Sequence, residues 1–290
     1  MDFLALFLVI FSAIFHAWWN FLAKGSQHKI AFLWLVTCAS VALYTPFALF
    51  FIRHLGSADS RGWLFSFISA VLHFLYVILL GKSYEYGELS LVYPLARSAP
   101  LFVPFLAVPL LGEQLSLIGI LGIILVMLGC YILHTESFSL VNLLEPIRSM
   151  KGVASRFAIS TALVISFYSV NDKIGLRYMD PFYFLWTSSL MRIIMMVPYM
   201  LITPGWKVIR EEWRINTKEV LISGALIFFA YFLVLVAMKT SKISYIVSVR
   251  QMSIIFAVLL GIIVLKERYG AIRLPASLVI TSGVVLIGLA

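Results

Sequence analysis

The chain has 290 residues, of which 62% are hydrophobic and only 12% are charged. A soluble domain is about a quarter charged, so this composition excludes a water-soluble globular protein and predicts one embedded in lipid. The net charge of +9 does not indicate nucleic-acid binding, because the basic residues stand singly among apolar segments and form no basic module.

Ten apolar segments are long enough, or nearly so, to cross a bilayer, which takes about 20 helical residues. The predicted fold class is therefore an all-α integral membrane protein with ten transmembrane helices. In chain order, the predicted helices span 3–22, 30–52, 63–80, 89–111, 117–134, 153–171, 181–203, 219–238, 244–265 and 271–289.

The longest connection, 135–152, divides the chain into a first unit at 1–134 and a second at 153–290. An offset of 154 residues places Ser90 on Ser244, Glu113 on Glu267 and Gly129 on Gly283, each at the same stage of a helix–loop–helix unit. Because each unit has an odd number of helices, the second unit enters the bilayer from the opposite side. The sequence therefore predicts two inverted five-helix repeats, a design found in many secondary transporters.

Three groups of residues resemble the EamA family of the drug/metabolite transporter superfamily. They are His16-Ala17-Trp18-Trp19-Asn20 with Lys24, Gly87 to Leu95 leading to Leu111-Gly112-Glu113, and Lys242 to Tyr245 leading to Leu265-Lys266-Glu267. The resemblance implies ten helices in two inverted halves, and a central cavity lined by the first, third, fourth, sixth, eighth and ninth. It also implies alternating access by rocking of the halves. One departure is Lys266, where the family has a small residue.

Ionisable side chains at membrane depth are costly and indicate function. Five basic side chains lie at this depth: His16, His73, Arg97, Arg192 and Arg250. The acidic residues closest to them lie at predicted helix ends, and these are Glu85, Glu88, Glu113, Asp172 and Glu267. Since an arginine stays protonated, basic groups without an acid at their depth favour an anionic solute. Snorkelling toward the interface is an alternative for Arg97 and Arg250, and the resemblance places the helix of Arg192 at the periphery.

In the first helix, His16, Asn20 and Lys24 recur every four residues and form one polar stripe, with Trp19 beside it. The stripe either lines the transport path or forms hydrogen bonds between helices. At the matching end of the sixth helix, Asn171-Asp172-Lys173 is either its counterpart or a plain helix-end cluster.

Further candidates for the cavity wall are aromatic or titratable side chains in the third, fourth, eighth and ninth helices. They are His73, Tyr76, Tyr93, Tyr231 and Tyr245. Packing or interface anchoring is the alternative role for each tyrosine. The two histidines can change charge near neutral pH, which leaves a proton-coupled or an exchange mechanism open.

The predicted function is secondary transport of a small organic anion across the plasma membrane of a bacterium or archaeon. Its partners are that solute and membrane lipids, with no nucleic acid and no cofactor; a monomer and a homodimer are both open. Alternatives are an exporter of amino acids or drug-like compounds, a channel, and a lipid-modifying membrane enzyme. The enzyme would need clustered nucleophiles, metal ligands or paired carboxylates, which the sequence does not show.

The basic residues give a prediction of orientation. Eleven lie in odd-numbered connections and six in even-numbered ones, so the positive-inside rule places the odd connections in the cytoplasm and both termini outside. The family resemblance implies termini inside, and the two expectations conflict.

Overall fold

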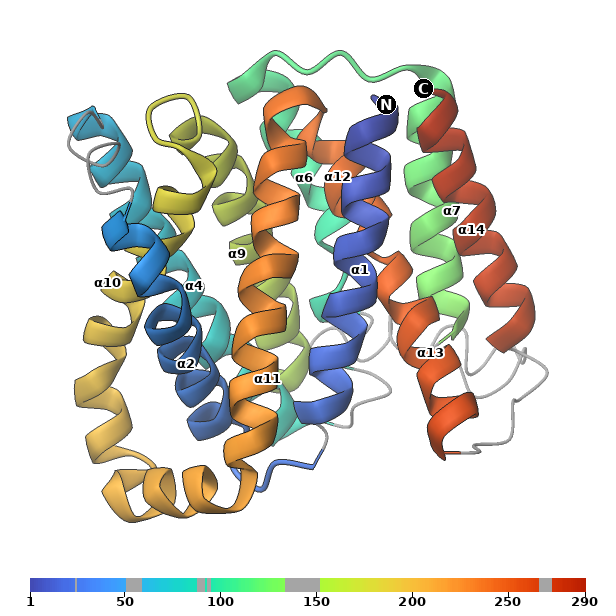
Figure 1. Ribbon diagram of the computed structural model, residues 1–290. Coiled ribbons are helices and arrows are strands. Elements are labelled where there is room, and N and C mark those ends of the chain that lie inside the picture. The colour runs from blue at the N-terminus through green and yellow to red at the C-terminus, as the bar shows by residue number, and fades with distance from the viewer. Residues whose placement is uncertain (24, 51–58, 88–91, 93–94, 134–151, 266–272) are drawn as a thin grey trace.

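The computed structural model describes residues 1–23, 25–50, 59–87, 92, 95–133, 152–265 and 273–290. Within these residues the chain forms eleven helices and no strand (Figure 1). In chain order they are α1 (Phe3–Ala23), α2 (Lys29–Phe50), α4 (Ser60–Tyr86), α6 (Ala99–Leu111), α7 (Leu117–Leu133), α9 (Val153–Gly175), α10 (Pro181–Ile202), α11 (Gly205–Thr240), α12 (Ile243–Val249), α13 (Met252–Leu265) and α14 (Arg273–Leu289).

Six of these helices, α1, α2, α4, α9, α10 and α11, are long and apolar enough to cross a membrane. Four shorter apolar stretches accompany them, Ala99–Leu111, Leu117–Leu133, Ile243–Ala257 and Pro275–Leu289. Large apolar side chains point outward from the bundle, and Phe3 and Ile202 are 81% and 83% exposed. A surface of this kind is stable against lipid rather than water. The chain is an all-α, multi-pass membrane protein, as predicted.

Two of the predicted helices are interrupted. The segment 89–111 is not one helix, because α6 begins only at Ala99, after a turn at Arg97 and Ser98. Pro100 explains this break: its ring collides with the carbonyl four residues earlier, and it has no N–H to donate. The segment 244–265 is likewise divided into α12 and α13, by a turn at 250–251 that contains no proline.

The eighth predicted helix, 219–238, is only the second part of a longer element. Helix α11 starts at Gly205 and bends at Asn216, whose φ of −117° and ψ of 27° are not helical. Most of the predicted connection 135–152 lies outside the described residues, as do Ser90 and Glu267 of the predicted repeat.

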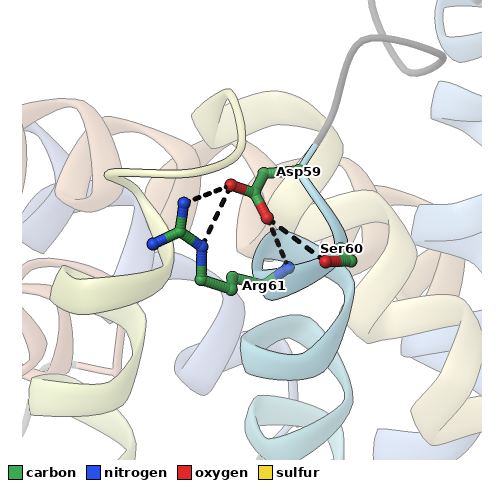
Figure 2. Close-up of polar contacts among 3 residues, drawn as sticks. All are labelled: Asp59, Ser60 and Arg61. Atoms are coloured by element: carbon green, nitrogen blue, oxygen red, sulfur yellow. Dashed lines mark hydrogen bonds and ion pairs between the residues drawn. The ribbon is translucent and has the colours of Figure 1, made fainter.

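Acidic residues mark the starts of several helices. Before α4, the Asp59 carboxylate accepts hydrogen bonds from the Arg61 backbone nitrogen at 2.9 Å and from the Ser60 hydroxyl at 3.3 Å (Figure 2). It also holds the Arg61 guanidinium at 2.6 and 3.0 Å. Asp180 caps α10 in the same way. These carboxylates satisfy free N–H groups and face the positive end of the helix dipole.

Glu113 does the same for a helix of the other half. It lies in the connection between α6 and α7, and it accepts hydrogen bonds from the backbone nitrogens of Ile243 and Ser244 at the start of α12. The Ser244 hydroxyl donates to it as well, at 2.7 Å. Glu113, one of the residues that resemble the EamA family, therefore connects the two halves of the chain through these hydrogen bonds.

The helix contacts between the two halves occur in pairs, and the two contacts of a pair differ only in which half supplies which helix. Helix α4 packs along α9 and α1 along α11, so the third helix of each half meets the first helix of the other. In the same way, α2 meets α11 while α4 meets α10, and α1 meets α13 while α6 meets α9. Two copies of one unit related by a two-fold axis produce contacts of this kind.

Helices α7 and α14 lie side by side and run in opposite directions (Figure 1). A Cβ atom on Gly122 would lie 2.7 Å from the Gly283 oxygen, and one on Gly129 would lie 2.9 Å from the Ala276 oxygen. The offset of 154 relates Gly122 to Ala276 and Gly129 to Gly283, so the second contact is the first with the halves exchanged. Small residues let helix backbones approach closely in lipid.

Candidate functional site

A chain of contacts inside the bundle links Asp172, Tyr231 and Arg250. Asp172 on α9 is fully buried and accepts a hydrogen bond from the Tyr231 hydroxyl at 2.6 Å. The Arg250 guanidinium, at the turn after α12, lies over the Tyr231 ring, with 5.3 Å between Cζ and the ring centroid. A cation over an aromatic face is attracted more strongly as both lose water. Tyr231 thus contacts an acid through its hydroxyl and a base through its ring.

His73 on α4 extends this group. Its ring stacks on Tyr168 of α9, with centroids 4.1 Å apart, and meets the Tyr231 ring edge-on at 5.7 Å. Tyr76 also lies edge-on to Tyr168, at 6.2 Å. The His73 Nδ1 atom lies 2.9 Å from the Ser69 carbonyl oxygen, and since a carbonyl only accepts, Nδ1 carries the hydrogen of this bond.

Residues of the polar stripe of α1, and Trp19 beside it, form hydrogen bonds with one another within the helix. The Trp19 indole donates to His16 Nδ1 at 3.2 Å, and the Asn20 amide donates to the His16 carbonyl at 2.6 Å. His16 itself lies within electrostatic range of both Arg97 and Arg250. Of the three described residues, His16 therefore lies within range of the arginine charges, whereas Trp19 and Asn20 bond within their own helix.

The two helix breaks meet each other. Gln251 Nε2 donates to the Arg97 carbonyl at 3.4 Å, and the offset of 154 pairs these same two positions. The Gln251 Oε1 atom is buried and has no hydrogen-bond partner in the described part of the chain. Both Arg97 and Arg250 lie within electrostatic range of Tyr168. The breaks therefore bring one arginine from each half to the same histidine and tyrosine.

Arg192 belongs to this group, although its helix was expected at the periphery. Its charge acts on both His73 and Asp172, and its guanidinium donates to the Thr37 hydroxyl of α2 at 3.4 Å. The Nε atom of Arg192 is buried, without a hydrogen-bond partner among the described residues. A buried donor left unused in this way is costly.

The expectation that no carboxylate lies at the depth of the arginines is wrong. Asp172 was placed at a helix end because α9 was predicted to stop at 171, but the helix continues and turns this side chain inward. Even so, Asp172 is the single carboxylate that the described residues bring to this cluster, against Arg97, Arg192 and Arg250. Among the residues that the structure describes, the cluster therefore carries more basic than acidic side chains.

Tyr245, another predicted site residue, lies apart from the cluster. Tyr245 is buried where α12 meets the start of α7: the Ser116 backbone nitrogen donates to its hydroxyl at 3.1 Å, and its ring fills the space beside Gly119. Lys24 and Tyr93 lie outside the described residues.

Tyr168 was not predicted from the sequence, and the predicted site did not include Asp172 or Arg192. One signal was available, since Tyr168 precedes Asp172 by four residues and so shares a helix face with it. No comparable signal points to Arg192. Among the residues that the structure describes, no group of three or more His, Cys, Asp and Glu side chains could hold a metal ion.

The side chains of the cluster come from α1, α4, α9, α10 and α11 and from the two breaks, so both halves build it. Such a fold and site define a multi-pass membrane protein with a charged interior, where intramembrane charges mark solute pathways. The model of the EamA-like transporter family matches residues 3–135 and, a second time, residues 154–289. The chain belongs to this family and is a membrane transporter of the drug/metabolite type.

The fold also has a known counterpart. A solved structure whose title reads "Crystal structure of protein" is 16% identical to this chain and superimposes with a TM-score of 0.75. The similarity covers 99% of this chain and 96% of the other, which shows a shared fold. A comparison with curated proteins found no match.

Proposed function

We propose that the protein is a secondary transporter of a small organic anion that carries a carboxylate, phosphate or phosphonate group. The observation that carries the proposal is the charge that the described residues bring to the cluster, one carboxylate, Asp172, and three guanidinium groups, those of Arg97, Arg192 and Arg250. An arginine cannot give up its proton in a protein. The three guanidinium groups are partly buried, so carbonyl groups, water or a bound anion can stabilise their charge, and a bound anion does so most directly.

The helix breaks favour Arg97 and Arg250 as the residues that bind the anion. Each stands at a break, where carbonyl and N–H groups leave the helical ladder and become available to a solute or to water. Helix α6 begins two residues after Arg97, so the positive end of its dipole adds to the same field. The fork of an arginine side chain matches two oxygens of a carboxylate or phosphonate.

The arrangement of the halves supports a mechanism of alternating access. Two observations support an inverted repeat: the paired helix contacts between the halves, and the opposite directions of α7 and α14. In such a protein, each half can adopt the conformation of the other, which opens the central site to the opposite side of the membrane. We place the protein in the plasma membrane. The two histidines of the cluster, His16 and His73, leave both proton coupling and exchange open.

Asp172 favours a second candidate, a zwitterionic solute such as an amino acid. The carboxylate of such a solute would bind the arginines, and its ammonium group would bind Asp172 and the face of Tyr231. This arrangement uses both signs of charge in the cluster. Under the first candidate, Asp172 instead holds Tyr231 in place beneath Arg250.

Thermal unfolding of the purified protein tests the two candidates. Methylphosphonate, benzoate, glycine, leucine and tetraethylammonium are added at matched ionic strength. A ligand at 100 times its Kd stabilises the folded state by about 2.7 kcal/mol, so a bound anion raises Tm by several degrees. Arg250→Gln is expected to weaken anion binding about tenfold to a hundredfold, because a hydrogen bond to a charged group is lost. Arg250→Lys keeps the charge without the fork and falls in between.

Arg177→Gln is the matched control, because Arg177 is exposed after the end of α9, and it should leave binding unchanged. Stabilisation by tetraethylammonium but by no anion would contradict the anionic candidate. So would unchanged anion affinity in both Arg97→Gln and Arg250→Gln. An amino acid that stabilises the natural protein but not Asp172→Asn would select the zwitterionic candidate.

A further inference from the structure

The first part of α11 lies across the end of the bundle. Residues 205–216 run roughly perpendicular to the spanning helices, at the end opposite the two chain termini, and the chain turns into the bundle at Asn216 (Figure 1). At the end of a bundle whose helices are long enough to cross a membrane, a helix in this position is expected at the boundary between hydrocarbon and water. Helices that lie in this plane are amphipathic, with basic residues on the polar face and aromatic residues near the lipid.

The faces of this segment are sharply divided. Its buried side chains, Ile209, Glu212 and Asn216, recur every three or four residues and point to the protein. Lys207, Arg210 and Arg214 are exposed and recur at the same spacing on the opposite face. Glu211 is the one exposed acidic residue between them.

Two tryptophans border the basic face. Trp206 and Trp213 are 63% and 40% exposed, and their spacing of seven residues puts them on one edge of the helix. Tryptophan is enriched at the depth of lipid headgroups, where its ring is in apolar surroundings and its N–H is hydrated. The tryptophans therefore place the neighbouring basic side chains at headgroup level.

Glu212 fixes the orientation of the segment. One carboxylate oxygen accepts a hydrogen bond from the His28 backbone nitrogen at 3.0 Å, just before α2, and the other accepts from the Asn216 amide at 2.7 Å. Because this carboxylate is buried and both its oxygens are bonded, the helix is held against the bundle with its basic face outward.

We propose that residues 205–216 form a binding surface for the headgroups of anionic phospholipids. The bilayer already surrounds the chain at this depth, so no other partner needs to be brought to the surface. Three basic side chains against one acidic one select negative headgroups over zwitterionic ones. Arginine also binds phosphate oxygens in pairs, which gives Arg210 and Arg214 the larger share.

Equilibrium binding of phosphatidylglycerol with a fluorescent acyl chain to the full-length protein in neutral detergent tests this surface. Phosphatidylglycerol should bind at least tenfold more tightly than the matching phosphatidylcholine. The double variant Arg210→Gln/Arg214→Gln should weaken phosphatidylglycerol binding about 30-fold, which is the contribution expected of two basic residues near an anionic surface. The matched control, Arg177→Gln/Lys239→Gln, removes two exposed charges from outside the segment and should change binding less than twofold.

Equal affinity for the two lipids would overturn the proposal, and so would an equal loss in the control variant. Glycerol 3-phosphate, which has the phosphate but no acyl chains, should not compete, and full competition would point to a phosphate site instead. Thermal unfolding without lipid verifies that the variants fold. Lys207→Gln/Arg214→Gln is the second variant if the first does not fold, and the same loss is expected.

Discussion

The hydroxyl of Tyr231 donates to the Asp172 carboxylate at 2.6 Å, while its ring lies under Arg250. Tyr231→Phe removes the hydroxyl and keeps the ring, so it separates these two roles. A buried carboxylate that loses a donor costs about 1–3 kcal/mol. We therefore expect Tyr231→Phe to lower the Tm of the purified protein by several degrees, measured by thermal unfolding in detergent.

Tyr44→Phe is the control, because the Tyr44 hydroxyl donates to the uncharged carbonyl of Ala225 at 3.1 Å. Hydrogen bonds between membrane helices average about 0.6 kcal/mol, so the loss of Tm should be smaller. Equal losses in Tyr231→Phe and Tyr44→Phe would mean that the Asp172 charge does not depend on its bond to Tyr231.

At this scale, the sequence allowed charged residues to be selected but did not show which residues lie beside them. Charges in apolar segments stand out, which is why His16, His73, Arg97 and Arg250 could be selected. Asp172 was misplaced because a helix end cannot be located to within a turn from hydropathy, and one turn decides whether a side chain faces inward. Arg192 could not be placed, because the sequence does not say which helices are neighbours.

Among the elements, α4 depends on a cap that can be titrated. Hydrogen bonds from the Arg61 side chain and backbone lower the pKa of Asp59 from 3.8 to about 2 (Figure 2). A carboxyl group with a lowered pKa stabilises the folded state above its unfolded pKa, and this contribution is lost as the pH falls through the folded value. The free energy of unfolding should therefore decline between about pH 4 and pH 2. Asp59→Asn should lower Tm at pH 7, and its Tm should fall less than that of the natural protein between pH 4 and pH 2.

Arg61→Gln isolates the cause, because it removes the guanidinium and keeps the backbone bond of the cap. It should raise the pKa of Asp59 and shift the decline in Tm toward higher pH, as followed by thermal unfolding across a pH series. If Asp59→Asn and the natural protein show the same pH dependence, other carboxyl groups control acid stability.

Long apolar helices were predictable, and departures from them only in part. The break before α6 has a visible cause in Pro100. The break at Arg250 has no such mark, and the contact of Gln251 with Arg97 accompanies it. The segment 205–216 was missed as a helix because its charges lower its hydropathy, although its spacing of basic and apolar residues is helical.

For the whole molecule, the offset of 154 residues was the most informative feature of the sequence. It predicted that the two halves correspond, and the contacts follow this relation. Arg97 meets its counterpart Gln251, and the contact of Gly122 with Gly283 is repeated, with the halves exchanged, by that of Ala276 with Gly129. What the sequence could not give is where the halves touch, because an offset relates positions without placing the axis between them.

The contact of α7 with α14 allows a test at this scale. A Cβ atom on Gly122 would lie 2.7 Å from the Gly283 oxygen, and one on Gly283 would lie 2.6 Å from the Gly122 oxygen. Backbone oxygens cannot move aside singly, so the helices must separate, and such overpacking costs about 1–3 kcal/mol. The helix propensity gained from alanine, about 1 kcal/mol, offsets only part of this. We expect Gly122→Ala and Gly283→Ala each to lower Tm by a few degrees.

The correspondence between the two halves extends this prediction to a third glycine. Gly129 corresponds to Gly283, and a Cβ atom on Gly129 would lie 2.9 Å from the Ala276 oxygen, so Gly129→Ala should lower Tm about as much as the other two. Gly25→Ala is the control, because the nearest atom to a Cβ there is 4.0 Å away. Thermal unfolding of all four variants compares them directly. A large loss of Tm in Gly122→Ala with none in Gly129→Ala would contradict this prediction. The two equivalent contacts would then contribute unequally to stability, although their geometry is similar.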